Sequence, residues 1–411
     1  MNEKEIERQL NILCTGTSDV INRKELAKKL KKGEPLRIKF GIDPTSKDIH
    51  IGHAVVLRKL KQFQDLGHQA ILLIGDFTAR VGDPSGKNTT RPVLSVEEIE
   101  SNMETYLDQA FLILDKSKTE IRMNSEWSAK FDIVDIMKLM GSVTVAQLLE
   151  RNDFSKRYKE GTPISVLEFL YPLLQGYDSV ALKADVELGG TDQLYNLLMG
   201  RPLQELDGQV PQICITTPLL EGIDGNKKMS KSLNNTIGLT DESLDMFGKV
   251  MKISDEIMPK YFQLATGWYP DKVDEILKSI ESGDLAQVDA KKLLACTVVD
   301  QYHGEGVGEI TKAEFANVFS KGERPIDIEI KELNSSEYEN IETPGSERLA
   351  RVLNSVGLVS SNKDGARMIA QGAVKIDDVV FDDENGEVVI KDLDGSYIQV
   401  GKRKWAQIKV S

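Results

Sequence analysis

Residues 36–76 read LRIKFGIDPTSKDIHIGHAVVLRKLKQFQDLGHQAILLIGD, and this stretch decides the fold of the first half of the chain. Residues 36–42 form a short run with branched side chains between prolines, which predicts a strand. From residue 51 to 66 apolar side chains recur at helical spacing, and Gly67 is typical of the residue after a helix. Residues 69–74 predict the next strand. Strand, helix and strand in this order form the unit of a parallel sheet, so we predict a doubly wound α/β domain.

The later parts of the chain differ in their strand content. Ser95 and Glu98 have the spacing of a capping box, which predicts a helix start. We expect a strand at 120–123, helices near 131–140 and 143–150, a helix that begins near Pro172, and a strand at 184–188. Helical segments dominate from 240 to about 319, and two short helices, 347–356 and 363–371, precede short strands. We divide the chain into an α/β domain (1–226) with an insert at about 124–165, a loop (227–239), a helical domain (240–320), a linker (321–344) and a small α+β domain (345–411).

The composition excludes several classes of protein. The chain has 411 residues, a net charge of −13, 40% hydrophobic and 28% charged residues, which is typical of globular proteins. The longest apolar run, residues 70–74, is too short to span a membrane. Residues 1–10 alternate acids and bases, unlike a signal or transit peptide, so we expect a cytoplasmic protein. Three distant cysteines and four scattered histidines predict neither a disulfide framework nor a dedicated metal site.

The first motif that points to chemistry is HIGH, residues 50–53, at the junction of strand and helix. Backbone N–H groups at a helix start favour anions, and His50 and His53, one turn apart, can donate to phosphate oxygens. Gly52 removes a side chain where a nucleotide must approach the backbone. Chance alone gives a specified four-residue string in roughly one chain of this length in a hundred.

The second motif is KMSKS, residues 228–232, between turn-forming residues at 224–226 and 234–235. Two lysines on such a loop can fold over a polyphosphate. A solvated lysine cluster is the alternative for this string alone. The two motifs together are much more specific than either one.

HIGH followed by KMSKS resembles the class I aminoacyl-tRNA synthetases, and residues 41–53 and 171–178 resemble the tyrosyl enzymes of bacterial type. Tryptophanyl enzymes usually carry methionine where this chain has Gln175. The resemblance implies a Rossmann-like catalytic domain that forms tyrosyl-adenylate and pyrophosphate from tyrosine and ATP. It then transfers tyrosine to the 3′ end of tRNA(Tyr). Mg²⁺ would arrive with ATP. A tryptophanyl-type synthetase and a catalytically silent RNA-binding relative remain as alternatives.

Three of the implied tyrosine-binding residues share one helix face. Tyr171, Gln175 and Asp178 are spaced i, i+4 and i+7. A buried phenol OH needs a partner and a carboxylate is a strong acceptor, so Asp178 is expected to bind it. The resemblance assigns the amino group of the substrate to Asp83 and implies a tyrosine site formed by Gly41, Asp43, Thr78, Asp83, Tyr171, Gln175, Asp178 and Gln193.

The implied nucleotide site draws on more distant segments. Residues 189–193 follow a predicted strand; their glycines let a ribose approach, and Asp192 can accept from its hydroxyls. Residues 82–88 are not a P-loop, because the spacing is one residue short and Asn88 replaces Ser or Thr. The resemblance implies catalytic roles for His50, His53, Lys87, Arg91, Lys228 and Lys231, and ATP binding by His50, Gly52, His53, Gly190, Asp192, Met229 and Lys231.

One position departs from the family pattern. The best-known tyrosyl enzymes have tyrosine two positions before the strand-end glycine, where it donates to the substrate phenol. This chain has Lys39 there. The sequence therefore leaves open what complements Asp178, and Lys39 either pairs with Asp178 or stays solvated.

The end of the chain has a different charge balance. Residues 346–411 carry 10 basic and 10 acidic side chains, so the net charge of −13 belongs to the preceding residues. Residues 348–375 resemble the RNA-binding module of ribosomal protein S4, although Asp377-Asp378 stands where Asn-Gly is common. A plain structural cap is the alternative. The resemblance further implies anticodon binding by 240–320, a homodimer, and RNA contacts by Arg348, Arg351, Arg367, Lys402, Arg403 and Lys404. The apolar stretch 133–149 is the candidate interface of the dimer, and a place in the protein core is the alternative.

Overall fold

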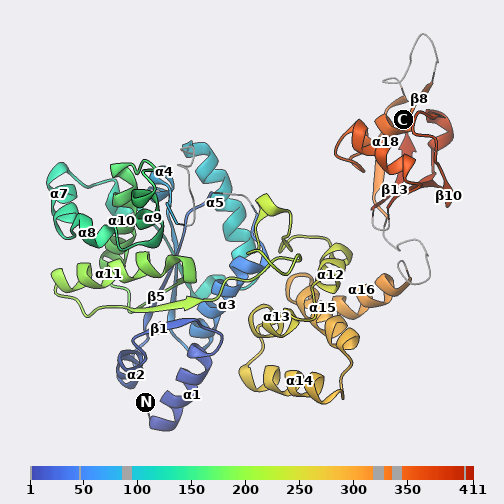
Figure 1. The fold of residues 1–411 in the computed structure, drawn as a ribbon. Coiled ribbons are helices and arrows are strands. Elements are labelled where there is room, and N and C mark those ends of the chain that lie inside the picture. Colours follow the sequence, from blue (N-terminus) through green and yellow to red (C-terminus); the bar gives the residue numbers. More distant parts are fainter. Residues whose placement is uncertain (1, 46–47, 86–94, 318–327, 336–344, 402–403) are drawn as a thin grey trace. The chain divides into compact units, whose positions relative to one another are not determined.

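The computed structural model describes residues 2–45, 48–85, 95–317, 328–335, 345–401 and 404–411 (Figure 1). The chain forms two compact units, Met1–Gly308 and Glu309–Ser411. The helical segment after residue 240 thus belongs largely to the same unit as the sheet. Among the described helices, none has the length and apolar character to cross a membrane.

A six-stranded sheet forms the centre of the first unit. Its order is β1-β6-β5-β2-β3-β4, in which β1 is antiparallel and the other five strands are parallel. The chain adds β3 and β4 on one side of β2 and β5 and β6 on the other, so the order reverses at β2. Ligands bind at the carboxyl ends of strands beside such a reversal. The strands are β1 (Asp19–Ile21), β2 (Arg37–Ile42), β3 (Gln69–Ile74), β4 (Thr119–Met123), β5 (Val186–Gly190) and β6 (Ile213–Thr217).

Helices cover both faces of this sheet, which confirms the doubly wound prediction. Figure 1 shows α3 on one face and α10 and α11 on the other. The predicted end of α3 at Gly67 is confirmed by its φ of +87°, and the capping box of Ser95 and Glu98 is present. The helices around the sheet are α1 (Glu3–Cys14), α2 (Arg23–Lys31), α3 (Ile51–Asp65), α4 (Thr78–Val81), α5 (Val96–Ala110), α6 (Ser125–Ser128), α7 (Ile133–Gly141), α8 (Val145–Leu148), α9 (Asn152–Lys159), α10 (Val166–Leu182) and α11 (Leu194–Leu206).

The prediction that a helix begins near Pro172 is wrong. Helix α10 begins at Val166, where Ser165 and Glu168 form a capping box. Pro172 therefore lies inside the helix, at the cost of one backbone hydrogen bond. Two satisfied N-terminal donors at Ser165 outweigh the preference of proline for a first turn.

A run of helices follows the KMSKS loop. They are α12 (Ser243–Met251), α13 (Met258–Ala265), α14 (Pro270–Ser282), α15 (Gln287–His303) and α16 (Val307–Ala316). Arg58 on α3 donates to Gln301 on α15 (Nε to Oε1, 3.0 Å), and its guanidinium carbon lies 5.5 Å from the ring centroid of Tyr302. These contacts attach the helical segment to the helix that begins at the HIGH motif.

In the second unit, helices α17 and α18 pack against a mixed sheet of order β10-β9-β12-β13-β7. Strand β7 (Ile330–Leu333) lies within the predicted linker and pairs in parallel with β13, so the described part of 321–344 is not only a linker. Asp377 and Asp378 have φ of +48° and +69° between the paired strands β9 and β10, and thus replace Asn-Gly in the turn. The other elements are β8 (Ser346–Arg348), α17 (Leu349–Ser355), α18 (Asn362–Ala370), β9 (Val374–Ile376), β10 (Val379–Val380), β11 (Glu387–Val389), β12 (Tyr397–Val400) and β13 (Lys404–Val410).

Candidate active site

A cleft of about 590 Å³ opens at the carboxyl ends of β2, β3 and β5. It lies where the strand order reverses, as expected for this architecture. Lys231 does not line the cleft, and Lys87 and Arg91 lie outside the described residues. The cleft brings together the predicted residues Gly41, Asp43, His50, Gly52, His53, Thr78, Asp83, Tyr171, Gln175, Asp178, Gly190, Asp192, Gln193, Lys228 and Met229.

Backbone hydrogen bonds join the two motifs that lie about 180 residues apart in sequence. The N–H of Ile51 donates to the carbonyl of Ile237 (3.0 Å), and the N–H of Leu239 donates to the carbonyl of Ile49 (3.1 Å). The segment after KMSKS is therefore fixed against the start of α3. This pairing sets the HIGH and KMSKS residues at one mouth of the cleft.

The two histidines of HIGH are held in a neutral state. Their ring centroids are 3.9 Å apart, and burial, His53 and Lys231 lower the pKa of His50 to about 3. The pKa of His53 falls to about 4, because protein surrounds much of the ring and Lys231 and Lys228 are near, although the residue keeps contact with solvent. Nδ1 of His50 is buried with no hydrogen-bond partner among the described residues. Neutral imidazoles here can donate to phosphate oxygens.

Gly52 is required by the close approach of these rings. A Cβ atom at this position would lie 2.9 Å from Nδ1 of His50 and 3.0 Å from its Cε1. Any side chain would displace the ring from the mouth of the cleft. The glycine therefore keeps both His50 and the adjacent backbone accessible to a nucleotide.

The lysines of the KMSKS loop contact acidic side chains around the cleft. Nζ of Lys231 lies 2.6 Å from Oδ2 of Asp48, and Nζ of Lys228 lies 3.9 Å from Oδ2 of Asp192. The buried side chain of Asn235 accepts from the N–H of Ser230 (2.8 Å), which fixes the base of the loop. Both lysine side chains remain substantially exposed, so they can reorient toward a bound polyphosphate.

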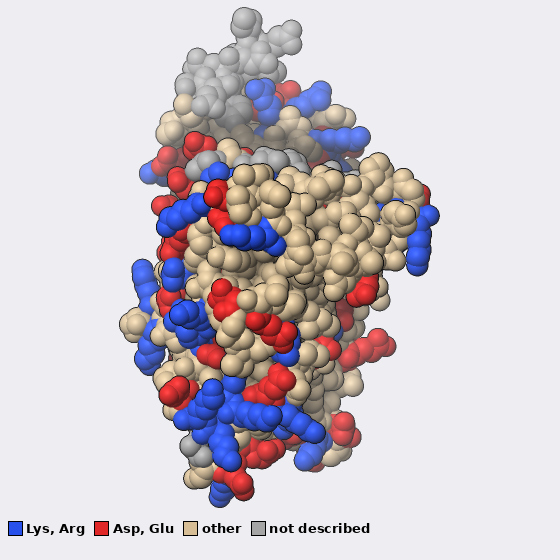
Figure 2. Space-filling view, turned by 90° about the vertical axis from the view of Figure 1, so that its left-hand side faces the viewer, with Lys and Arg blue, Asp and Glu red and all other residues tan. Residues whose placement is uncertain are grey.

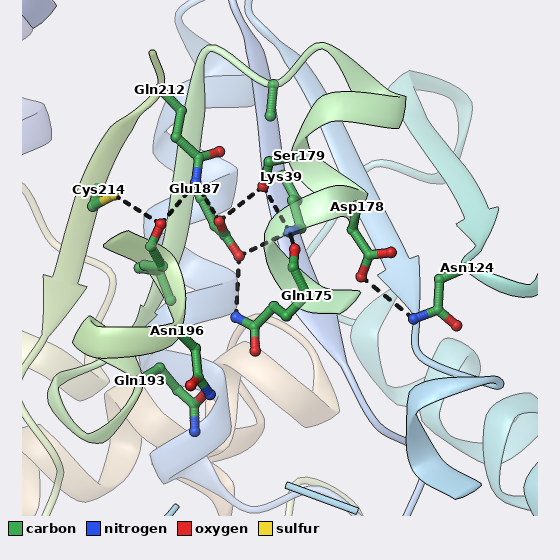
Figure 3. A network of polar contacts seen from close by, with 12 residues as sticks. Lys39, Asn124, Gln175, Asp178, Ser179, Glu187, Gln193, Asn196, Gln212 and Cys214 are labelled. Carbon is green, nitrogen blue, oxygen red and sulfur yellow. Dashed lines mark hydrogen bonds and ion pairs between the residues drawn. The ribbon is translucent and has the colours of Figure 1, made fainter. Parts of the chain in front are cut away.

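Asp178 forms the floor of the cleft, and the structure identifies its partners. Its Oδ1 accepts from Nε1 of Trp127 (2.8 Å) and its Oδ2 from Nδ2 of Asn124 (3.3 Å; Figure 3). Burial raises the pKa of Asp178 to about 7, against the opposing effects of Lys39, Trp127 and Asn124. The sequence reasoning missed Trp127 and Asn124. Their position directly after β4, at the carboxyl edge of the parallel sheet, was the available signal.

Lys39 neither pairs with Asp178 nor stays solvated, so both alternatives left by the sequence are wrong. Its Nζ lies 2.9 Å from Oε1 of Glu187, and the two side chains are 0% and 1% exposed. Neighbouring parallel strands place them side by side, since Lys39 is in register with Glu187 between β2 and β5 (Figure 3). The register of β2 against β5, which the sequence does not reveal, therefore determines that Glu187 is the partner of Lys39.

On another side of the cleft, a chain of hydrogen bonds connects the side chains of Tyr171, Asp43, Thr78 and Asn124. The hydroxyl of Tyr171 donates to Oδ2 of Asp43 (2.8 Å), and the hydroxyl of Thr78 donates to Oδ1 of the same carboxylate (2.8 Å). Nδ2 of Asn124 donates to Oγ1 of Thr78 (3.0 Å). Asp43 and Tyr171 are thus oriented before any ligand is bound.

Asp83 meets a residue from the insert that the sequence reasoning missed. Nε2 of Gln193 donates to Oδ2 of Asp83 (2.9 Å), and the buried guanidinium of Arg151 lies 3.7 Å from Oδ1. Arg151 also donates to Oγ of Ser85 (2.7 Å) and to Oδ1 of Asn196 (3.0 Å). Arg151 therefore braces the carboxylate that is expected to hold the amino group. Among the described residues, no group of three or more His, Cys, Asp or Glu side chains is arranged to hold a metal ion.

Comparison with known proteins gives one consistent family. The family described as tRNA synthetases class I (W and Y) matches residues 31–320. A tyrosine–tRNA ligase from Carboxydothermus hydrogenoformans is 48% identical over 409 residues, which cover 98% of each chain. One from Francisella tularensis is 49% identical over 403 residues, again covering 98% of each chain.

Solved structures agree on the fold. The tyrosyl-tRNA synthetase of Archaeoglobus fulgidus, complexed with L-tyrosine, has a TM-score of 0.62 at 23% identity and covers 75% of this chain and 99% of its own. The mitochondrial enzyme of Aspergillus nidulans has a TM-score of 0.63 at 20% identity and covers 77% and 100%. The long matches at nearly half identity decide the assignment: this chain belongs to the class I tRNA synthetases (W and Y), within the group of the tyrosine–tRNA ligases.

Proposed function

We propose that this protein joins tyrosine to tRNA(Tyr) in two steps at the cleft. The observation that carries the proposal is the buried carboxylate of Asp178, which lies at the floor of the cleft that HIGH and KMSKS flank. A carboxylate there accepts a hydrogen bond from a phenol OH, which phenylalanine and tryptophan lack. The 46–49% identical tyrosine–tRNA ligases support the same substrate.

In the first step a carboxylate oxygen of tyrosine attacks the α-phosphorus of ATP, the bond to the bridging oxygen breaks, and pyrophosphate leaves. The protein supplies no nucleophile, so catalysis consists of positioning and stabilisation of charge. His50 and His53 donate to the phosphate oxygens, and Asp192 accepts hydrogen bonds from the ribose hydroxyls. Lys228 and Lys231 bind the leaving pyrophosphate. Mg²⁺ enters with ATP. In the second step a hydroxyl of the terminal adenosine of tRNA attacks the tyrosyl carbonyl and releases AMP.

Tyrosine alone should support ATP–pyrophosphate exchange when all standard amino acids are tested separately. Binding of the phenol OH by Asp178 favours tyrosine, and an analogue without the OH leaves buried polar groups unpaired. Equal exchange with tryptophan would favour a tryptophanyl enzyme. No exchange with any amino acid, together with retained tRNA binding, would favour the silent relative.

The insert supports the proposal of a homodimer. Ile133, Met137 and Val145 are 73%, 65% and 62% exposed on α7 and α8. Figure 2 shows this side of the molecule, where a broad area in the upper half is almost without charged side chains. Exposed apolar side chains on an area with few charges favour a protein–protein contact. A second copy of the chain is the occupant that the family resemblance implies.

Met137→Glu should convert the dimer to a monomer, because it buries an unpaired carboxylate in the proposed interface. Sedimentation velocity measures the assembly state directly. Val288→Glu is the matched control, since Val288 is 53% exposed on α15, outside the insert. A Met137→Glu protein that sediments like the wild type would contradict the assignment of the interface.

The second unit supports a role in RNA binding. Arg348, Arg351 and Arg367 are exposed at the two packed helices α17 and α18, whereas Lys402 and Arg403 lie outside the described residues. Lys404 donates to the carbonyl of Leu358 (2.8 Å) and thus also stabilises the unit. We assign phosphate contacts to these arginines, anticodon binding to α12–α16, and the cytoplasm as the site of action.

Ending the chain after residue 317 should leave tyrosine-dependent exchange largely intact and weaken tRNA binding. The cut precedes β7, because this strand pairs with β13 and belongs to the second unit. Loss of phosphate contacts should also flatten the salt dependence of tRNA affinity, by about 0.7–0.9 per contact in the log–log slope. Unchanged affinity and salt dependence, measured by filter binding, would make the second unit a structural cap.

A further inference from the structure

A fully buried ion pair lies at the tyrosine end of the cleft, which Lys39 lines, and has no place in the proposed reaction. Lys39 on β2 and Glu187 on β5 are 0% and 1% exposed, with 2.9 Å between Nζ and Oε1. A buried pair of this kind adds little net stability, because desolvation offsets much of the attraction. Its contacts with the helix that carries Gln175 and Asp178 therefore point to a role in recognition.

Every donor of Lys39 is already used. Besides Glu187, its ammonium group donates to the carbonyl of Gln175 (2.8 Å) and to Oγ of Ser179 (2.9 Å). An ammonium group has three N–H bonds, and all three have acceptors. Lys39 therefore does not donate to a substrate phenol, unlike the tyrosine that stands there in the best-known relatives. Instead it ties one turn of α10 to the sheet.

Glu187 holds the same turn of α10 through hydrogen bonds from the side chains of that turn. Its Oε1 accepts from Nε2 of Gln175 (3.2 Å), and its Oε2 accepts from Oγ of Ser179 (3.0 Å) and Nε2 of Gln212 (2.5 Å; Figure 3). Gln175 and Ser179 flank Asp178 in this turn. The pair thus fixes both the orientation of Gln175 and the position of the backbone that carries Asp178.

We propose that Lys39 and Glu187 are positioning residues for tyrosine recognition, which hold Gln175 and Asp178 against the cleft without touching the substrate. This inference rests on the proposed function and assigns part of its specificity. The positive charge of Lys39 also faces Asp178 and favours its ionised form, to which a phenol OH donates most strongly.

The charged groups around Asp178 determine how tyrosine affinity should depend on pH. Burial raises the pKa of Asp178 to about 7, Lys39 from β2 lowers it, and Glu187 from β5 raises it by a smaller amount. Trp127 and Asn124 lower it through hydrogen bonds, and Tyr171 is the titratable neighbour on α10. Ionised Asp178 binds the phenol better than its protonated form. Tyrosine affinity should therefore be full above about pH 7 and decline as the pH falls below it.

Lys39→Met should move this decline to higher pH, because the cation that favours the ionised carboxylate is gone while Glu187 remains. A shift of one pH unit corresponds to a loss of about fivefold in tyrosine affinity at pH 7 and of about tenfold well below pH 7. Lys39→Met with Glu187→Gln should show a smaller shift in the same direction, since both charges are removed. Calorimetric titration of the full-length proteins with tyrosine between pH 5.5 and 9 measures the midpoint, and exchange assays measure KM for ATP, which should not change.

Lys29→Met is the matched control. Lys29 forms a largely buried ion pair with Asp185 (2.7 Å) directly before β5, at the end of the strand away from the cleft. Lys29→Met should lower Tm without moving the pH midpoint of tyrosine binding. If Lys39→Met does not fold, the double variant decides, because it leaves no unpaired buried carboxylate. A double variant with the wild-type midpoint and affinity would overturn the inference. Wild-type protein that does not bind tyrosine would instead refute the proposed function.

Discussion

Asp178→Ala should remove most of the preference for tyrosine over phenylalanine. A site built to bind an OH group rejects the analogue without it, because the buried polar groups of the site then lack a partner. Tyrosyl-tRNA synthetases are themselves the standard example of this rejection, at about 10⁵, and that magnitude comes from them. In this chain Asp178 accepts from Trp127 and Asn124 and has further acceptor capacity for the phenol. We expect the ratio of kcat/KM values for the two amino acids to fall at least about 10²-fold.

Discrimination should change more than stability in this variant. Alanine leaves the N–H donors of Trp127 and Asn124 without their acceptor, which lowers stability. It also removes a carboxylate whose ionised form is disfavoured by burial, which offsets part of this loss. Tyr177→Phe is the matched control, because it removes one hydroxyl from the residue that precedes Asp178 on α10, and the ring of Tyr177 packs on Phe131 and does not line the cleft. A lower Tm with an unchanged preference for tyrosine would show that Asp178 only supports the fold.

Lys231→Ala should slow the formation of tyrosyl-adenylate by about 10²–10³-fold, which is typical of losing one donor aimed at charge in the transition state. Lys231 is paired with Asp48, and the two side chains are 41% and 60% exposed. An exposed pair contributes about 0–1 kcal/mol, so release of the lysine toward pyrophosphate costs little. Single-turnover kinetics isolate this step from product release.

The effect should fall on the chemical step and not on tyrosine binding. Lys227→Ala is the control, because Lys227 is exposed on the same loop but lies outside the KMSKS motif. Near-normal single-turnover rates for Lys231→Ala would contradict a catalytic role of the loop. A matching loss in Lys227→Ala would indicate a general charge effect.

Local sequence patterns predicted the elements that carry the motifs. The period of the apolar side chains in 51–66 and the glycine at 67 predicted where α3 begins and ends. Helix periodicity and capping depend on residues within one or two turns. The capping box at Ser95 was equally local. Helix α10 begins before the predicted start at Pro172, because the capping box of Ser165 and Glu168 starts the helix at Val166.

The sequence by itself determined the doubly wound fold and the HIGH and KMSKS motifs, because these depend on residue type and local spacing, and its resemblance to the class I synthetases implied the candidate residues of the cleft. Only the tertiary structure decided their partners. The register of β2 against β5 gave Lys39 to Glu187, the end of β4 brought Trp127 and Asn124 to Asp178, and pairing with β13 made a strand of residues 330–333. Such pairings join residues more than 50 positions apart, and no local preference of the chain encodes which buried charge meets which.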